Sequence, residues 1–199
     1  ELADAEGATE RIYELVDKWP AWTLGKFTLK PRQGTSARGR VAGTSKRGEV
    51  QAVRGALPRL AAFGGAVLEP WLARRADFST QLYIAPEGSV HVLGTLQQVN
   101  TASGFYLGHR GVMRGDYVHC DHAVHDELAE RARAVGQLAS RIGYRGPAGV
   151  DTFSFLAGKE TYWRWASEFN ARFTTGTVTL SILRWARETL KLASTVPFE

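Results

Sequence analysis

The chain has 199 residues, 44% of them hydrophobic and 11% aromatic, which is enough for one compact domain or two small lobes with a buried core. Its 25 basic and 20 acidic residues give a net charge of +5, but the basic residues are scattered, which disfavours nucleic acid as a partner. No apolar stretch approaches the roughly 20 residues that cross a bilayer, the first residues are too acidic for a signal peptide, and the single cysteine, Cys120, excludes an intrachain disulfide. We therefore expect a soluble, cytoplasmic protein with neither a nucleic-acid nor a membrane partner.

Residues 1–68 show the patterns of a small α+β lobe. Thr9 is placed to cap the first helix and Pro20 to close it. A polar, glycine-containing loop over 33–39 separates the first two strands. The predicted elements, in chain order, are a helix over 9–19, a strand over 26–30, a strand near 40–43, a helix over 49–63 and a short strand over 66–69.

Residues 69–199 show the patterns of a larger α+β lobe. Asp121 is placed to cap its first helix. The segment 101–118 is rich in glycine without a clear period, which indicates a loop with some strand. The remaining predictions are a hairpin of strands over 77–84 and 89–100, a helix over 123–142, paired strands over 149–157 and 161–171, and a helix over 177–193.

The strand over 161–171 has one ionic and one apolar face. Because side chains alternate along a strand, Arg164, Glu168 and Asn170 share one face. The other face carries aromatic residues that we interpret as core, namely Trp163, Trp165 and Phe169.

A two-residue turn at Gly158-Lys159 would place Asp151 opposite Ala166 and diagonal to Glu168. Two carboxylates and the amide oxygen of Asn170 then converge. Like charges held close together resist ionisation unless a cation lies between them. Oxygen ligands of this kind suit Mg²⁺, which completes its coordination with phosphate oxygens and water, so the trio predicts a nucleotide. The alternative is a solvated strand face.

Two segments near the end of the chain resemble the closing motif of ATP-grasp ligases. They are residues 146–151, which read Gly-Pro-Ala-Gly-Val-Asp, and residues 168–174, which read Glu-Phe-Asn-Ala-Arg-Phe-Thr. The resemblance implies an α+β fold in which two α+β lobes clasp ATP. It also implies that Asp151, Glu168 and Asn170 bind Mg²⁺, or Mn²⁺ in its place, at the nucleotide phosphates.

The same resemblance implies nucleotide contacts earlier in the chain. Lys30-Pro31 resembles the family's phosphate-binding lysine at a strand end, and residues 67–72 resemble its hinge between lobes. A lysine on a strand is a fixed positive charge, and glycine-rich loops offer free backbone N–H groups. The implied nucleotide contacts are Lys30, Gly34, Thr35, Ser36, Glu69, Trp71, Leu72 and, as a ribose ligand, Asp77.

Arg172 follows Asn170 by two residues and points to the same face if the strand continues. Its planar fork suits a transferring phosphoryl group or an acyl-phosphate, so Arg172 and Lys30 are the candidate catalytic residues; the alternative for Arg172 is a salt bridge to Glu168 or Asp151. Further phosphate or carboxylate candidates are Arg110 and Arg114.

The cluster of His119, Cys120, His122 and His125 has the residue types of a zinc site. Its spacing fits no closed structural zinc pattern, so a helix start with exposed histidines is the favoured interpretation.

The resemblance implies an ATP-dependent ligase that joins a small-molecule carboxylate to an amine through an acyl-phosphate. The alternative is an ATP-grasp-like module that binds or senses nucleotide without ligation. Members of the family usually carry a preceding domain that residues 1–20 do not provide. We therefore expect a part of a longer chain without its N-terminal pre-ATP-grasp domain, with a homodimer as one candidate assembly.

Overall fold

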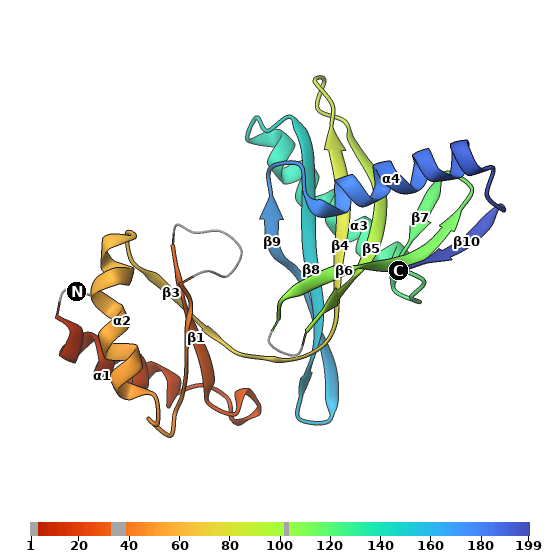
Figure 1. Ribbon diagram of the computed structural model, residues 1–199. Helices are drawn as coiled ribbons and strands as arrows, with labels where there is room; N and C mark the ends of the chain where they lie inside the picture. The colour runs from red at the N-terminus through yellow and green to blue at the C-terminus, as the bar shows by residue number, and fades with distance from the viewer. Residues whose placement is uncertain (1–3, 33–38, 102–103) are drawn as a thin grey trace. The chain divides into compact units, whose positions relative to one another are not determined.

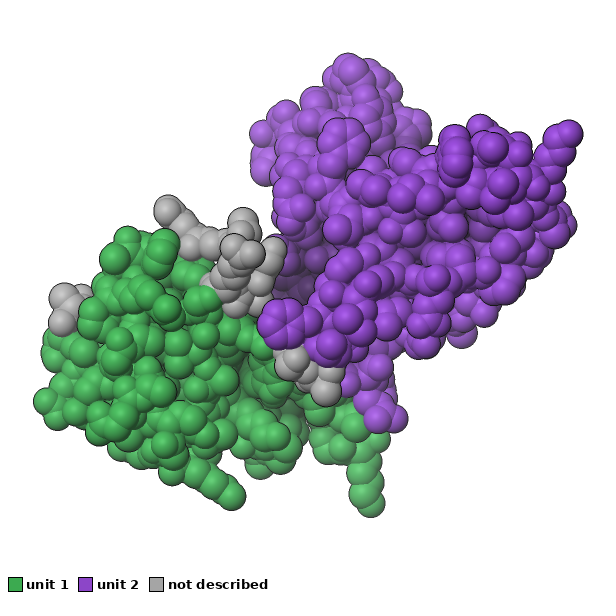
Figure 2. Space-filling model, viewed as in Figure 1, with its two compact units in different colours: residues 1–73, 156–160 green, residues 74–155, 161–199 purple. Residues whose placement is uncertain are grey.

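The computed structural model describes residues 4–32, 39–101 and 104–199 and divides into two compact units (Figure 2). Unit 1 comprises residues 1–73 together with 156–160, and unit 2 comprises residues 74–155 together with 161–199. The boundary predicted between residues 68 and 69 falls within strand β3 (Ala66–Pro70), which belongs to unit 1.

Unit 1 is a three-stranded antiparallel sheet with two helices (Figure 1). The sheet has the order β2-β1-β3, with Thr28 on β1 opposite both Ala42 on β2 and Glu69 on β3. The other elements of the unit, in chain order, are α1 (Ala5–Val16), the short 3₁₀ helix η1 (Ala21–Thr23), β1 (Lys26–Pro31), β2 (Val41–Thr44) and α2 (Val50–Ala62).

The core of unit 1 forms where the helices contact one face of its sheet. Phe27 and Leu29 alternate along β1 with Thr28 and Lys30, so the apolar pair faces the helices. The opposite face therefore carries Lys30. The core residues are Ile12, Tyr13, Val16, Phe27, Leu29, Val53, Leu57 and Leu60.

Unit 2 is built on a seven-stranded sheet with the path β10-β6-β5-β4-β8-β9, and β7 pairs with β6 beside this path. Because the chain's order differs from the strand order, the sheet brings together residues that are far apart in the sequence. The strands are β4 (Ala73–Ile84), β5 (Val90–Asn100), β6 (Tyr106–Arg114), β7 (Tyr117–His119), β8 (Gly146–Ala157), β9 (Glu160–Asn170) and β10 (Thr195–Phe198).

Helices α3 (His125–Arg141) and α4 (Thr175–Leu190) lie on opposite faces of this sheet (Figure 1). Ala132 of α3 packs with Leu82 and Val150, whereas Leu180 of α4 packs with Leu96. Alternation along the strands therefore turns Gln81 and Asp151 towards the α4 face. Among the residues that the structure describes, no helix combines the length and apolar character needed to cross a membrane.

Two predicted helix caps are wrong. Asp4 caps α1 by accepting from the Gly7 N–H, while Thr9 lies inside the helix and donates to the Ala5 carbonyl. Likewise α3 begins after Val124, and Asp121 lies before it in a left-handed conformation. Helix α1 begins four residues before Thr9, and α3 begins four residues after Asp121, so neither residue lies at the N-cap position.

Two strand assignments also differ from the prediction. The segment 101–118, expected to be a loop with some strand, contains β6 and most of β7. Strand β10 was not predicted, and it pairs with β6 so that Val196 lies opposite Met113.

Candidate functional site

Asp151 lies on β8 and is the centre of a hydrogen-bonded cluster on the α4 face of unit 2. Its Oδ1 accepts from the Ser79 hydroxyl at 2.7 Å and from the Gln98 amide at 3.2 Å. Its Oδ2 accepts from the Asn170 amide at 3.1 Å. Strands β4, β5 and β9 thus each supply one donor, which fixes the orientation of the carboxylate.

Strand β9 places the other predicted residues next to Asp151. The Thr152 hydroxyl donates to the Trp165 carbonyl, and the Ser167 hydroxyl donates to the Asp151 carbonyl, so Asp151 lies beside this part of β9. Asn170 is buried, at 9% exposure, whereas Glu168 is exposed. Asp151 and Asn170 are therefore in direct contact, with Glu168 two residues before Asn170.

Arg172 approaches the same cluster. Its guanidinium donates to the Asn170 Oδ1 at 3.1 Å and to the Phe173 carbonyl at 3.3 Å. Among the described residues it forms no salt bridge with Glu168 or Asp151, which was the alternative considered for it. Its exposed side chain carries positive charge at the edge of the cluster.

The environment of Asp151 opposes its negative charge. Burial raises the pKa of Asp151, and the charge of Glu168 raises it further, while the hydrogen bonds from Ser79 and Asn170 lower it. A cation near the two carboxylates would offset both unfavourable effects. A positively charged ligand beside Asp151 would therefore favour its ionised form.

The chemistry of the donor set fits a hard divalent cation. Asp151 Oδ2 and Asn170 Oδ1 each accept one hydrogen bond, so each retains a lone pair, and none of the described residues donates to the Glu168 carboxylate. No group of three or more His, Cys, Asp or Glu side chains within the described ranges could hold a metal ion. A site here therefore depends on Asn170 as well as the two acids.

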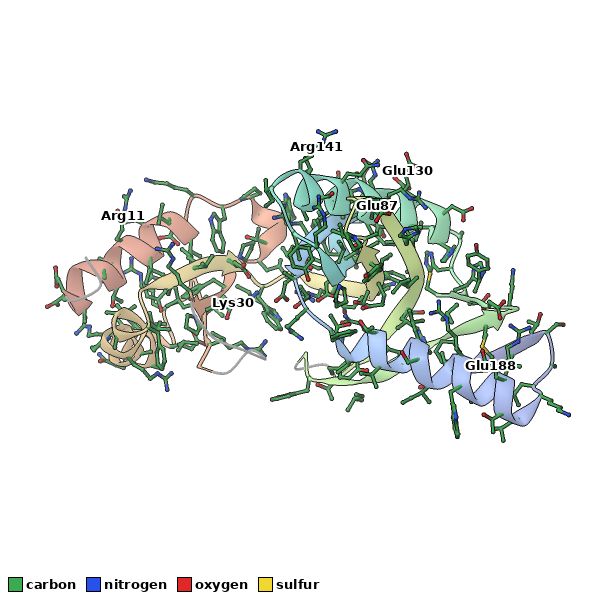
Figure 3. The ribbon with its side chains drawn as sticks, turned by 90° about the horizontal axis from the view of Figure 1, so that it is seen from above. Arg11, Lys30, Glu87, Glu130, Arg141 and Glu188 are labelled. Atoms are coloured by element: carbon green, nitrogen blue, oxygen red, sulfur yellow. The ribbon has the colours of Figure 1, made fainter. Side chains whose placement is uncertain are left out.

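In unit 1, the predicted nucleotide residues lie on β1, β3 and the segment after β3. Lys30, labelled in Figure 3, forms an ion pair with Glu69. The register places Glu69 opposite Thr28, so Lys30 and Glu69 are diagonal neighbours on the open face of the sheet. Trp71 and Leu72 follow β3, both half-buried. The Arg40 guanidinium lies 4.6 Å from the centre of the Trp71 ring, and both border a pocket of about 170 Å³.

The remaining candidates are three residues of unit 1, together with Asp77, Arg110 and Arg114 of unit 2. Gly34, Thr35 and Ser36 lie outside the described residues. Asp77 on β4 forms an ion pair with Arg74, at 2.7 Å. Arg114 forms an exposed ion pair with Asp121, at 3.7 Å, and Arg110 is exposed on β6.

The His and Cys cluster lacks the features of a metal site. Cys120 is buried, and burial raises the pKa of its thiol to about 11. The His119 and His125 rings lie 4.3 Å apart, while His122 contacts Phe78 and Trp163. This cluster, like the rest of the described chain, holds no three-ligand group of His, Cys, Asp and Glu.

Sequence reasoning missed Ser79, Gln81 and Gln98. The available signal was that Asp77, Ser79 and Gln81 occupy every second position of β4. Three polar side chains therefore share one face of a strand in the interior of the sheet. The pairing of β4 with β8, which the sequence does not reveal, is what turns that face towards Asp151.

Several solved structures have the same fold as this chain. A biotin carboxylase from Campylobacter jejuni, in complex with β-γ-ATP, has a TM-score of 0.61 at 17% identity, covering 91% of this chain and 37% of its own. The biotin carboxylase domain of the Hydrogenobacter thermophilus 2-oxoglutarate carboxylase, with MgADP, ADP and bicarbonate, has a TM-score of 0.62 at 20% identity, covering 91% and 36%. N5-carboxyaminoimidazole synthetase from Staphylococcus aureus has a TM-score of 0.57 at 16% identity, covering 83% and 38%.

These proteins are ATP-grasp enzymes, and the chain therefore has the ATP-grasp fold, which confirms the predicted fold class. The chain spans little more than a third of the length of these three structures. No protein-family model matches the chain, and no curated protein matches it in sequence.

Proposed function

We propose that this chain is the nucleotide-binding part of an ATP-dependent ligase that joins a carboxylate to an amine through an acyl-phosphate. The proposal is carried by the Asp151 carboxylate, which accepts hydrogen bonds from Ser79, Gln98 and Asn170. Glu168 lies beside it on β9. Such an arrangement is costly without a cation and becomes favourable with one. The ATP-grasp fold and the nucleotides named for two similar structures support the same conclusion.

Each residue has a distinct part in the proposed reaction. Asp151, Glu168 and Asn170 would hold Mg²⁺, or Mn²⁺ in its place, and the metal supplies neutralisation of phosphate charge. Arg172, which is exposed and already oriented by Asn170, would bind oxygens of the transferring phosphoryl group. These residues act by positioning and charge stabilisation, which is most of what phosphoryl transfer requires.

Unit 1 would supply further phosphate and adenosine contacts. Lys30 forms an ion pair with Glu69. A phosphate oxygen that binds Lys30 would take the place of the Glu69 carboxylate. We assign the remaining nucleotide contacts to Glu69 on β3, to Trp71 and Leu72 directly after β3, and to Gly34, Thr35 and Ser36. Asp77, on β4 of unit 2, would contact the ribose.

Calorimetric titration with ATP and Mg²⁺ tests the metal assignment. We expect the wild-type chain to bind, and Glu168→Ala to bind at least about 10-fold more weakly, because loss even of a group supporting a metal ligand typically has that effect. Glu130→Ala, which removes an exposed acid of α3, is the matched control and should bind as the wild type does. Normal binding of Mg-ATP by Glu168→Ala would show that the site is assigned to the wrong residues.

Release of ADP tests the ligase assignment separately. Turnover that requires both an added carboxylate and an added amine would support the ligase. Binding of Mg-ATP without any such release, across a panel of small carboxylates and amines, would instead favour a module that only binds nucleotide.

A further inference from the structure

A chain of side-chain hydrogen bonds connects the start of helix α4 to Asp151. Gln81, on β4, is fully buried at 0% exposure, and its Nε2 donates to the Ser79 Oγ at 2.8 Å. The Ser79 hydroxyl donates in turn to Asp151, at 2.7 Å. At the other end, Gln81 Oε1 accepts from the hydroxyls of Thr174 and Thr177, at 2.6 and 3.1 Å.

The backbone of α4 fixes the direction of this chain. Thr174 and Thr177 form a capping box, in which each hydroxyl oxygen accepts from the backbone N–H of the other residue. Each hydroxyl directs its proton to Gln81 Oε1, which lies nearer to both hydroxyl oxygens than their 3.4 Å separation from each other. Because that oxygen is held by two donors, the amide NH₂ group must face Ser79, whose own proton is then directed to Asp151.

The surroundings are shaped to hold the Gln81 side chain in this orientation. The register between β4 and β5 shifts beside Gln81, which pairs with Gly94 while Leu82 pairs with Val92, so the extra residue, Leu93, lies on β5. Two glycines border the amide: a Cβ at Gly176 would lie 2.4 Å from Gln81 Nε2, and one at Gly149 would lie 3.4 Å from Oε1. A Cβ at Gly176 would overlap the amide, so the space beside Nε2 requires a glycine there, whereas a Cβ at Gly149 would be in ordinary contact with it.

We propose that Gln81 is a positioning residue, which orients the Ser79 hydroxyl as a donor to Asp151 and so holds that carboxylate ready for the metal. This inference rests on the proposed function, since it presupposes that Asp151 binds a cation. Gln81 acts only through Ser79 and does not contact the metal. The alternative role of Gln81 is purely structural, as an acceptor for the first turn of α4.

Measuring the affinity for Mn²⁺ separates the two roles. The titration is made at saturating ATP, and the electron paramagnetic resonance signal reports the concentration of free Mn²⁺. We expect Gln81→Met, which keeps the length but removes the amide, to weaken Mn²⁺ binding about 10-fold, and Ser79→Ala to do the same. The double variant should bind no more weakly than either single variant, because both act along one path. Gln97→Met, on the opposite face of β5, is the matched control and should bind as the wild type does.

Additive losses in the double variant, or wild-type affinity in Gln81→Met, would overturn the positioning role. Proton–nitrogen NMR of the metal-free chain gives a second measurement, in which Ser79→Ala should shift the Gln81 side-chain amide signals and leave those of Gln97 in place. Unshifted Gln81 signals in a chain that binds Mn²⁺-ATP would overturn the positioning role and leave the proposed function standing. A wild-type chain that failed to bind Mn²⁺-ATP would overturn both.

Discussion

His109 on β6 is a buried imidazole, 6% exposed, on the same face of the sheet as Gln98. Its Nδ1 lies 2.9 Å from the Tyr106 hydroxyl and 3.0 Å from the Thr179 hydroxyl. Burial lowers the pKa of His109 from 6.5 to about 4, because the protonated ring loses its hydration. The folded chain therefore binds this proton more weakly than the unfolded chain. The stability that the neutral His109 contributes is fully present above pH 6.5, the pKa in the unfolded chain, and is lost as the pH falls towards 4, the pKa in the folded chain.

We expect His109→Gln to reduce the acid sensitivity of unfolding. Between about pH 6.5 and pH 4 the wild-type chain should lose up to about 3 kcal/mol of unfolding free energy through this one group. Urea unfolding at several pH values in that window measures the slope. His91→Gln, which removes an exposed imidazole from β5, is the control. An identical slope in His109→Gln and the wild type would contradict the assignment.

At the scale of single residues, the predictable part of the site is the part that lies within one hairpin. Asp151 and Asn170 could be placed together because β8 and β9 are joined by a two-residue turn, which leaves few registers. Ser79 and Gln98 were not predictable as partners of Asp151. They lie 72 and 53 residues away in the sequence and reach it only through the pairing of strands along the sheet.

At the scale of elements, two helical glycines make opposite predictions. Gly176 lies in the first turn of α4, where a Cβ would lie 2.4 Å from Gln81 Nε2, so Gly176→Ala should lower the unfolding free energy by about 1–3 kcal/mol through overpacking. Gly55 lies in α2 with nothing within 4 Å of its Cβ position, so Gly55→Ala should raise it by about 0.5–1 kcal/mol. Chemical denaturation measures both variants. Equal effects at the two sites would argue against a close contact between Gly176 and Gln81.

Elements with a strong period were predicted well, and those defined by their partners were not. Helices α2 and α3 follow clear apolar stripes, and α2 forms although Pro58 lies inside it. Strand β6 was predicted only as part of a loop with some strand, because Gly108 and Gly111 interrupt its alternation. Strand β10 is four residues long and contains Pro197, so it exists through its pairing with β6 rather than through propensity.

At the scale of the whole molecule, the two units have separate cores. The core of unit 1 is one cluster of side chains from α1, β1 and α2, and unit 2 contains three further clusters. The predicted fold class is confirmed because the chain is similar in fold to solved ATP-grasp structures. The sequence resemblance to ATP-grasp ligases rests on the two closing segments, 146–151 and 168–174, and on Lys30-Pro31 and residues 67–72, whereas the patterns along the chain indicate only α+β lobes.

The late position of β10 has a consequence for folding during synthesis. The core residues of unit 1 all lie between Ile12 and Leu60, so they are available once that stretch has left the ribosome. The sheet of unit 2 cannot be completed until Thr195–Phe198 emerges and pairs with β6, about 80 residues earlier. We expect ribosome-bound chains arrested soon after residue 73 has emerged to resist proteolysis over residues 12–60 while the later residues stay cleavable. Cleavage of both regions up to release of the full chain would show instead that the two units fold together.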